Sequence, residues 1–224
     1  MDLNIKKNLV LPSRYHIKCP YKMTPEFIVV HNTANDASAA NEVAYMVRND
    51  NKISFHYAVD DQGVVQGVPE NRNAWHAGDG TTGNGNRCGI GVEICYSKSG
   101  GERFVKAERN AARFIASRLK AYGWGIERVK KHQDFDGKYC PHRTLDNGWN
   151  RFLKLIQAEL DANKVNEEEE EVKKFNTIEE IPEYGKATVQ KLVDAGALHG
   201  TGEGLALSED MLRILVILDR MGKL

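Results

Sequence analysis

The sequence predicts an α/β fold in which helices flank a central mixed β-sheet, with a small two-helix module at the C-terminal end. Short β-branched apolar runs alternate with amphipathic stretches of helical period before residue 163. Five consecutive glutamates at 167–171 interrupt this pattern, and only helical periodicity follows them. We therefore expect a domain over residues 1–162, an acidic linker over 163–176 and a helical module over 177–224. The acidic run could equally extend the preceding helix.

Short apolar runs rich in Val and Ile predict the strands of the sheet: residues 27–30, 53–59, 64–65 and 89–95. The first run ends at His31, as a buried strand that delivers a side chain at its tip would. In the last run, the even-numbered apolar residues share one face and Glu93 lies on the other. Glu93 can therefore face a cleft while its neighbours fill the core.

Helical spacing predicts the helices that cover this sheet. Residues 38–48 form one amphipathic segment, and residues 106–122 form a longer one that ends before Gly123, which suits the left-handed turn closing a helix. A third helix begins at Trp149 and runs to the acidic linker.

The segment after the linker predicts two more helices, separated by a glycine-rich turn over residues 196–204. Val189, Leu192 and Val193 line the first helix. Ser208 precedes two acidic residues, a sequence typical of the N-terminal cap of a helix. A two-helix unit of this size is marginally stable alone, so we expect it to pack on a copy of itself or on the first domain.

Charge is unevenly distributed along the chain, although the net charge is zero. Residues 1–165 hold 24 basic and 18 acidic side chains, whereas residues 166–224 hold 7 and 13. The basic excess would suit an anionic partner, but the sequence has no arginine-rich tract or aromatic stacking motif, so we do not expect nucleic acid.

No apolar run approaches the ~20 residues that span a bilayer, and the N-terminal segment does not have the pattern of a signal peptide. We therefore expect no membrane span and synthesis in the cytoplasm.

Two histidines and a cysteine stand out as candidate metal ligands: His31, His132 and Cys140. Two imidazoles and a thiolate suit Zn²⁺, and three protein ligands leave the fourth tetrahedral position open for water. The spacing between His132 and Cys140 matches no zinc finger, which disfavours a closed structural site. His142 is a rival ligand, and spacing alone does not decide between it and Cys140. The remaining cysteines, Cys19, Cys88 and Cys95, do not make a disulfide framework, although a pairing among them stays open.

Hydrolysis at such a metal requires groups outside the ligand set. Glu93 is the candidate base that takes a proton from water and returns it to the leaving group. Lys138 lies two residues before Cys140, where its ammonium group could stabilise an oxyanion that forms beside the metal.

With these residues in view, the chain resembles the type 2 N-acetylmuramoyl-L-alanine amidases, the family of T7-type phage lysozymes, phage endolysins and peptidoglycan recognition proteins. The resemblance spans roughly residues 20–160 and lies in ordered blocks: FIVVHNTA, FHYAVDDQGVVQGVP, AWHAGDG, GIGVEICYS and HQDFDGKYCPHRTL. The stretch around Glu93 and the GKYCPH segment most resembles endolysins from phages of Gram-positive hosts.

The resemblance implies zinc ligands at His31, His132 and Cys140, a base at Glu93 and an oxyanion-stabilising lysine at Lys138. Weaker expectations place substrate contacts at three residues: Asn32, Thr33 and His76. A tyrosine on which some members rely is replaced here by Phe55. The implied reaction is zinc-dependent hydrolysis, within bacterial peptidoglycan, of the amide between the lactyl group of N-acetylmuramic acid and L-alanine. An enzyme of this kind would act on the cell wall after release from the cytoplasm.

Two other functions remain open from sequence: a non-catalytic peptidoglycan-binding protein and a cytosolic amidase that recycles muropeptides. The segment 177–224 is similar to C-terminal modules of clostridial prophage wall hydrolases and, loosely, to half of an S-layer homology repeat. We expect it to bind a secondary wall polymer, or alternatively to form a homodimer.

Overall fold

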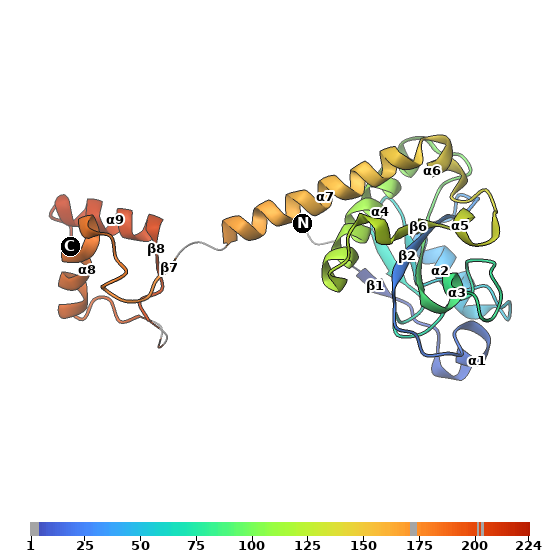
Figure 1. Ribbon diagram of the computed structural model, residues 1–224, viewed down its shortest axis with the longest axis horizontal. Coiled ribbons are helices and arrows are strands. Elements are labelled where there is room, and N and C mark those ends of the chain that lie inside the picture. The colour runs from blue at the N-terminus through green and yellow to red at the C-terminus, as the bar shows by residue number, and fades with distance from the viewer. Residues whose placement is uncertain (1–4, 171–173, 201, 203) are drawn as a thin grey trace. The chain divides into compact units, whose positions relative to one another are not determined.

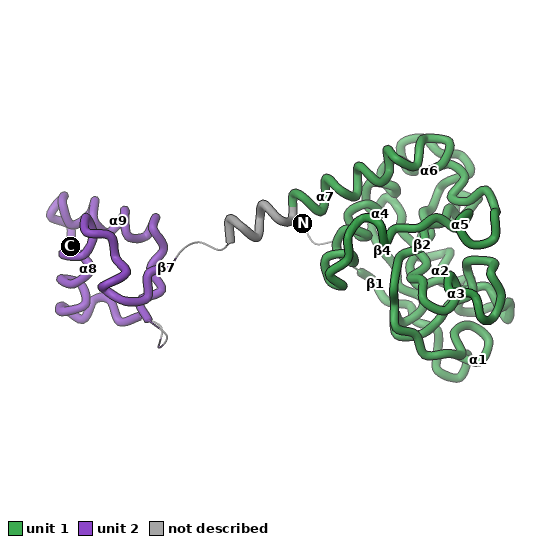
Figure 2. The backbone as a smooth tube through the Cα atoms, in the orientation of Figure 1, with its two compact units in different colours: residues 1–162 green, residues 163–224 purple. Residues whose placement is uncertain are grey.

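The computed structural model describes residues 5–170, 174–200, 202 and 204–224, and for 163–170 it describes the backbone only. Two compact units divide the chain, residues 1–162 and residues 163–224 (Figure 2). The boundary coincides with the end of the predicted first domain. Assignment of functions to these units stays a prediction.

The first unit is built on a mixed sheet, which confirms the predicted fold class (Figure 1). Among the described residues the sheet has six strands in the order β1-β4-β3-β5-β2-β6. Every neighbouring pair is parallel except β3 and β4, which form an antiparallel hairpin. The strands are β1 (Ile5–Lys7), β2 (Phe27–Asn32), β3 (Tyr57–Val59), β4 (Val64–Gln66), β5 (Gly89–Ile94) and β6 (Val129–Lys131).

Helices and two short 3-10 turns surround this sheet. They are η1 (Pro12–Arg14), α1 (Tyr15–Lys18), α2 (Ala39–Arg48), α3 (Asn84–Cys88), α4 (Gly101–Tyr122), η2 (Ile126–Arg128), α5 (Gln133–Asp136), α6 (His142–Asp146) and α7 (Trp149–Glu170). Ser38 caps α2 by accepting a hydrogen bond from the backbone N–H of Asn41, as such residues commonly do. Gly123 ends α4 in the left-handed conformation, as predicted.

Several boundaries differ from the sequence prediction. The predicted strand 53–59 is shortened to β3, because Ser54 hydrogen-bonds the backbone N–H and C=O of Trp75 and draws the chain away from the sheet. Helix α4 begins at Gly101, five residues before its predicted start, and both this glycine and the preceding Gly100 have positive φ. Strands β1 and β6 were not predicted, because they are three-residue edge strands that carry lysines.

The acidic run is helical over much of its length. Helix α7 continues to Glu170, which agrees with the alternative that this run extends the preceding helix. The rest of the predicted linker includes residues 171–173, which lie outside the described residues, and two residues of a short strand, β7 (Lys174–Phe175).

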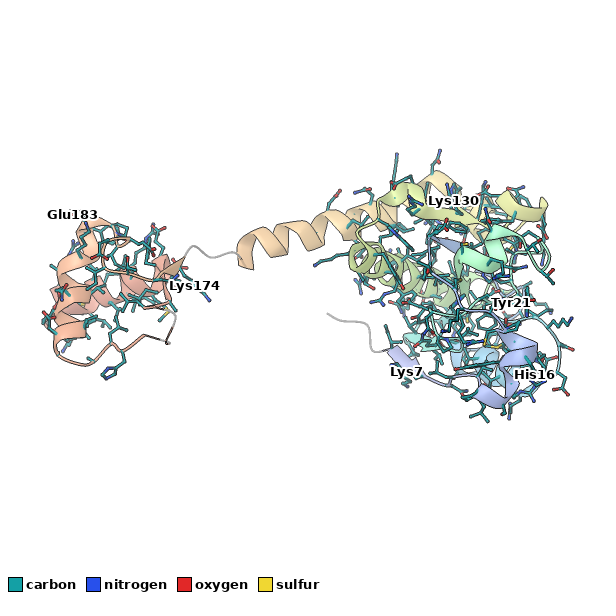
Figure 3. All side chains as sticks on the ribbon, turned by 60° about the horizontal axis from the view of Figure 1, so that its bottom comes forward. Lys7, His16, Tyr21, Lys130, Lys174 and Glu183 are labelled. Carbon is teal, nitrogen blue, oxygen red and sulfur yellow. The ribbon has the colours of Figure 1, made fainter. Side chains whose placement is uncertain are left out.

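The second unit contains the two predicted helices, α8 (Glu183–Asp194) and α9 (Glu209–Arg220). Ser208 caps α9 by accepting from the N–H of Met211, as its sequence context predicts. A two-stranded antiparallel ladder between β7 and β8 (Leu207–Ser208) closes the unit. Figure 3 places Lys174 and Glu183 on this unit. Its small core is apolar and consists of Phe175, Ile181, Val189, Leu207, Leu212 and Val216.

The strand register gives the sheet of the first unit two different faces. Val30, Tyr57 and Val92 stand side by side across β2, β3 and β5, and the ring of Tyr57 packs against Phe114 of α4. The next residues along, His31 and Glu93, are also paired and therefore point to the opposite face. One face thus carries the apolar core under α4, while the other receives the polar side chains.

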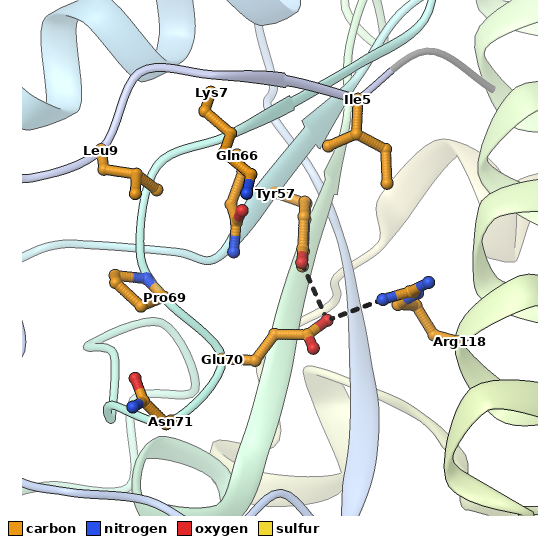
Figure 4. A pocket seen from close by; sticks show the side chains of 9 residues that line it. All are labelled: Ile5, Lys7, Leu9, Tyr57, Gln66, Pro69, Glu70, Asn71 and Arg118. Carbon is orange, nitrogen blue, oxygen red and sulfur yellow. Dashed lines mark hydrogen bonds and ion pairs between the residues drawn. The ribbon is translucent and has the colours of Figure 1, made fainter.

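Polar links fasten α4 to its surroundings on the core face. The Glu70 carboxylate accepts a hydrogen bond from the hydroxyl of Tyr57 at 2.8 Å and lies 3.8 Å from Arg118 (Figure 4). The hydroxyl of Tyr122 donates to the same carboxylate at 2.8 Å. Burial is the largest cause that raises the pKa of both tyrosines, so the two phenols remain donors to this carboxylate.

None of the helices in the described part of the chain is long and apolar enough to cross a membrane. The four cysteines are free thiols in this structure, so the disulfide pairings left open by the sequence are not formed.

Among the side chains that the structure describes, two ion pairs join α4 to α7, and they differ in burial. Glu108 is 4% exposed and lies 2.6 Å from Arg151, whereas Arg113 and Glu159 are 52% and 35% exposed and lie 3.2 Å apart. Arg151→Met would leave the Glu108 carboxylate buried without its cation. We expect it to lower the free energy of unfolding by about 2 kcal/mol, less than a fully buried pair because Arg151 is half-exposed.

The matched control for this prediction is Arg113→Met, which breaks the exposed pair between the same two helices. It should cost less than about 1 kcal/mol. Urea unfolding of the first unit in the two variants measures the difference between their free energies of unfolding. An equal decrease in both variants would contradict the assignment of Glu108 as a buried, ion-paired carboxylate.

Candidate metal centre and groove

Two parallel strands bring the candidate histidines together. His31 lies near the carboxyl end of β2, and His132 follows β6, its parallel neighbour. The backbone N–H of His132 donates to the carbonyl of Val30 at 3.2 Å, which fixes the start of the loop relative to β2. The carboxyl ends of parallel strands meet at one edge of a sheet, so this placement follows directly from the topology.

Cys140 completes the cluster from the loop before α6. The Nδ1 atoms of His31 and His132 are 3.0 Å apart, and Cys140 Sγ lies 3.9 Å from Nδ1 of His31. All three residues are buried, and their ligand atoms lie within 4.8 Å of one another. His142, the rival ligand, instead directs its Nε2 towards the carbonyl of Ser97 at 3.4 Å and is outside this cluster.

The outer nitrogen of each ring has a partner that sets its protonation. His76 Nε2 can only donate to the carbonyl of Gly89, so its Nδ1 accepts a hydrogen bond from His31 Nε2 at 3.0 Å. His132 Nε2 donates to the Asp136 carboxylate at 3.1 Å. Both rings therefore direct a lone pair from Nδ1 towards the centre of the cluster.

The donor set fits a metal ion. Two nitrogen lone pairs that face each other at 3.0 Å repel unless a cation or a proton lies between them. Burial lowers the pKa of His31 and of His132, which favours neutral imidazoles. Burial, followed by the charge of Glu93, raises the pKa of the Cys140 thiol to about 11, so the thiolate requires a cation beside it.

Close approach of glycine backbone permits this arrangement of rings. A Cβ atom built on Gly91 of β5 would meet the ring carbons of His76 at 2.8 Å, so a larger residue would displace this histidine. Sequence reasoning did not assign Asp136 or the orienting position of His76. The sequence does indicate the role of Asp136, because a residue four positions after His132 can contact it within one helical turn.

Glu93 lies beside the cluster with an unusual environment. Its Oε2 atom is buried and has no hydrogen-bond partner among the described residues. Burial is the main cause that raises the pKa of Glu93 to about 8, the charge of Glu42 adds to it, and Lys138 opposes it. A carboxylate with a buried, unsatisfied oxygen serves no evident structural purpose.

A groove of about 230 Å³ opens next to Glu93 and Lys138. The strand-end residues Asn32 and Thr33 line it, and so does the neighbouring Phe55. Its other wall comes from α2 and the segment that follows, through side chains that include Tyr45, Asn49, Asn51 and Ile53. The groove therefore joins the polar face of the sheet to α2.

The residues predicted to contact substrate differ in their surroundings. The Asn32 carboxamide is buried and accepts from the backbone N–H groups of Arg143 and Thr144, so it fastens the start of α6. Thr33 lines the groove, and its buried hydroxyl has no hydrogen-bond partner among the described residues. His76 is buried against His31 and is not among the groove-lining residues.

Comparison with known proteins connects this geometry to a family. The profile of the N-acetylmuramoyl-L-alanine amidase family matches residues 21–143. The N-acetylmuramoyl-L-alanine amidase CwlA of Bacillus subtilis strain 168 is 60% identical over 161 residues, which cover 71% of this chain and 59% of CwlA. The amidase XlyB of the same organism is 53% identical over 201 residues, which cover 86% of this chain and 63% of XlyB. The structure of PlyL superposes with a TM-score of 0.67 at 54% identity, covering 69% of this chain and 97% of PlyL.

The matches span about three-fifths of the length of CwlA and XlyB. The family profile covers more than half of this chain and includes all three residues of the buried cluster and Glu93. The resemblance drawn from the ordered sequence blocks is confirmed: the chain belongs to the N-acetylmuramoyl-L-alanine amidase family.

Proposed function

We propose that this protein is a zinc-dependent N-acetylmuramoyl-L-alanine amidase that acts on bacterial peptidoglycan. The bond cleaved is the amide between the lactyl carbonyl of N-acetylmuramic acid and L-alanine of the stem peptide. One observation carries the proposal: a carboxylate with a buried, unsatisfied oxygen stands next to a buried His-His-Cys cluster at the edge of a groove. Family membership specifies the reaction that such a site would perform.

Zinc would be held by Nδ1 of His31, Nδ1 of His132 and Sγ of Cys140. Imidazole and thiolate together favour zinc over the harder ions that prefer carboxylates. A zinc ion bound there would polarise the substrate carbonyl and lower the pKa of water in its open position. His76 and Asp136 support the site by holding the two ligand rings in orientation.

Glu93 acts as the proton carrier. Its carboxylate takes a proton from the attacking water and passes it to the amine of L-alanine as the amide breaks. The burial that raises its pKa makes it a stronger base than an exposed glutamate and able to hold the proton until the leaving group accepts it. Lys138, on the same groove, stabilises the negative charge that develops on the carbonyl oxygen.

The second unit would attach the enzyme to the wall. Helix α9 and the residue that follows it carry four large apolar side chains that are at least half-exposed: Met211, Ile214, Ile217 and Met221. These lie outside the core of the unit and offer an apolar surface for a secondary wall polymer or for a second copy of the chain. We propose wall attachment as the role of this surface, with the enzyme acting on the wall after release from the cell that makes it.

Digestion of purified walls tests the reaction. The protein should release new N-terminal alanine without new reducing sugars, and a chelator should abolish this release until zinc is added back. Amine labelling and a reducing-sugar assay on the same samples measure the two products. New reducing ends without new amines would identify a glycosidase and refute the proposal.

Substitution of the proposed base tests the mechanism. Glu93→Gln should keep its bound zinc but lose about 10²–10⁴-fold in kcat, because proton transfer to and from water loses its carrier. Glu102→Gln, an exposed glutamate of α4, is the matched control and should retain wild-type activity. Metal analysis and hydrolysis of a soluble muropeptide give both quantities, and near-full activity in Glu93→Gln would remove this residue as the base.

Removal of the second unit tests its role. Deletion of residues 166–224 should leave hydrolysis of soluble muropeptides within about twofold of the full chain, because the groove belongs to the first unit. Binding to sedimented walls should fall. Ile214→Lys in the full chain should reduce wall binding in the same way if the α9 surface makes the contact, whereas sedimentation velocity would reveal dissociation of a dimer instead.

A further inference from the structure

Lys18, at the end of α1, is a completely buried lysine outside the metal centre. Its ammonium group has three N–H donors, and the structure supplies three acceptors. These are the side-chain oxygen of Asn49 at 2.8 Å, the carbonyl of Asn51 at 2.5 Å and the carbonyl of Ile53 at 3.1 Å. All of them belong to one short segment, residues 49–53.

This segment has few other interactions that could fix its conformation. It follows α2, and none of the backbone–backbone hydrogen bonds described for the chain involves residues 50–53. Its internal order comes from the Asn49 carboxamide, which accepts from the N–H of Asn51 at 3.0 Å. The same side-chain oxygen is bound by Lys18, so the lysine holds the centre of the turn.

Neighbouring groups strengthen this attachment. Arg14 donates to the carbonyl of Asn49 at 2.5 Å and to the carboxylate of Asp50 at 2.8 Å. The hydroxyl of Ser54 donates to the backbone carbonyl of Lys18 at 2.6 Å. The segment is therefore tied to the η1–α1 region at both of its ends, and Lys18 supplies the buried cation.

The segment forms one wall of the groove. Asn49, Asn51 and Ile53 line the same groove as Glu93 and Lys138. The residues that hold this wall, Arg14 and Lys18, precede the region 21–143 that matches the family profile. A part of the chain outside the matched region thus shapes the surface that would meet the ligand.

We propose that Lys18 is a positioning residue for the groove, holding residues 49–53 in the conformation that binds the muramoyl-peptide ligand. The identity of this ligand rests on the proposed function. The ammonium group of Lys18 does not contact the reacting groups: all its described hydrogen bonds go to residues 49–53, and none goes to Glu93, Lys138 or the His-His-Cys cluster. Its loss should therefore weaken ligand binding and leave the chemical step intact.

Kinetics of the zinc-loaded full chain on a soluble muropeptide separate these two effects. Lys18→Met keeps the length of the side chain and removes its donors; KM should rise about tenfold while kcat stays within about twofold. Lys22→Met is the matched control, since it makes the same substitution at an exposed lysine, and it should change neither constant. Unchanged KM in Lys18→Met, or a fall in kcat alone, would overturn the proposal.

A milder variant and a second measurement keep the test decisive. If Lys18→Met does not fold, Arg14→Met decides: it removes the outer, partly exposed contacts and should raise KM by a smaller factor, and an unchanged KM would overturn the proposal. Calorimetric titration of Glu93→Gln with the same muropeptide, with and without Lys18→Met, measures binding without turnover. A wild-type chain that binds the muropeptide but does not hydrolyse it would refute the amidase function, whereas equal affinity in the two titrated proteins would refute the role of Lys18.

Discussion

The parallel pairing of β2 with both β5 and β6 is the constraint on which the site depends. The pairing with β5 places His31 opposite Glu93. The pairing with β6 brings His132, which follows β6, to the same end of the sheet. Because side chains alternate along a strand, the register that buries Val30 and Val92 under α4 also directs His31 and Glu93 to the groove. A one-residue slip of β5 would turn Glu93 into the apolar core. The register of β2 against β5 therefore determines both which apolar side chains are buried and where His31 and Glu93 lie.

This arrangement carries a stability cost that is local to the site. A folded-state pKa of about 8 for Glu93, against an ordinary value of 4.5, means that the metal-free folded chain holds this proton more tightly than the unfolded chain. Between these two pH values the folded state loses stability as pH rises, because the carboxyl must ionise where it is shielded from water. The facing lone pairs of His31 and His132 add a second unfavourable contact. A cation between these rings and the thiolate relieves the repulsion and opposes the rise in the pKa of Glu93, so metal binding and folding favour each other.

Much of the sheet and of the candidate site could be predicted from sequence, because His31 and Glu93 lie in strands with a clear apolar pattern. The runs before His31 and around Glu93 have the β-branched and alternating character that marks strands, and each was found close to its true bounds. Strands β1 and β6 are too short and too rich in lysine to show such a pattern, and residues 53–55 leave the sheet at a side-chain contact between Ser54 and a distant loop. The choice of Cys140 over His142 depends on a tight loop whose direction spacing does not encode. The geometry places Cys140 in the cluster and His142 against Ser97.

Lys18 shows why contacts of long sequence separation escape this kind of prediction. The sequence around it predicts no element, and lysines are rarely buried. Only the folded chain reveals three acceptors more than thirty residues away that match its three donors. The ammonium group compensates for backbone carbonyls that the irregular turn leaves without partners, and without it these carbonyls would have to turn towards water. Residues 49–53 can therefore form the groove wall without regular secondary structure, because the ammonium group of Lys18 on α1 fixes their conformation. The wall then presents amide and apolar side chains to a ligand.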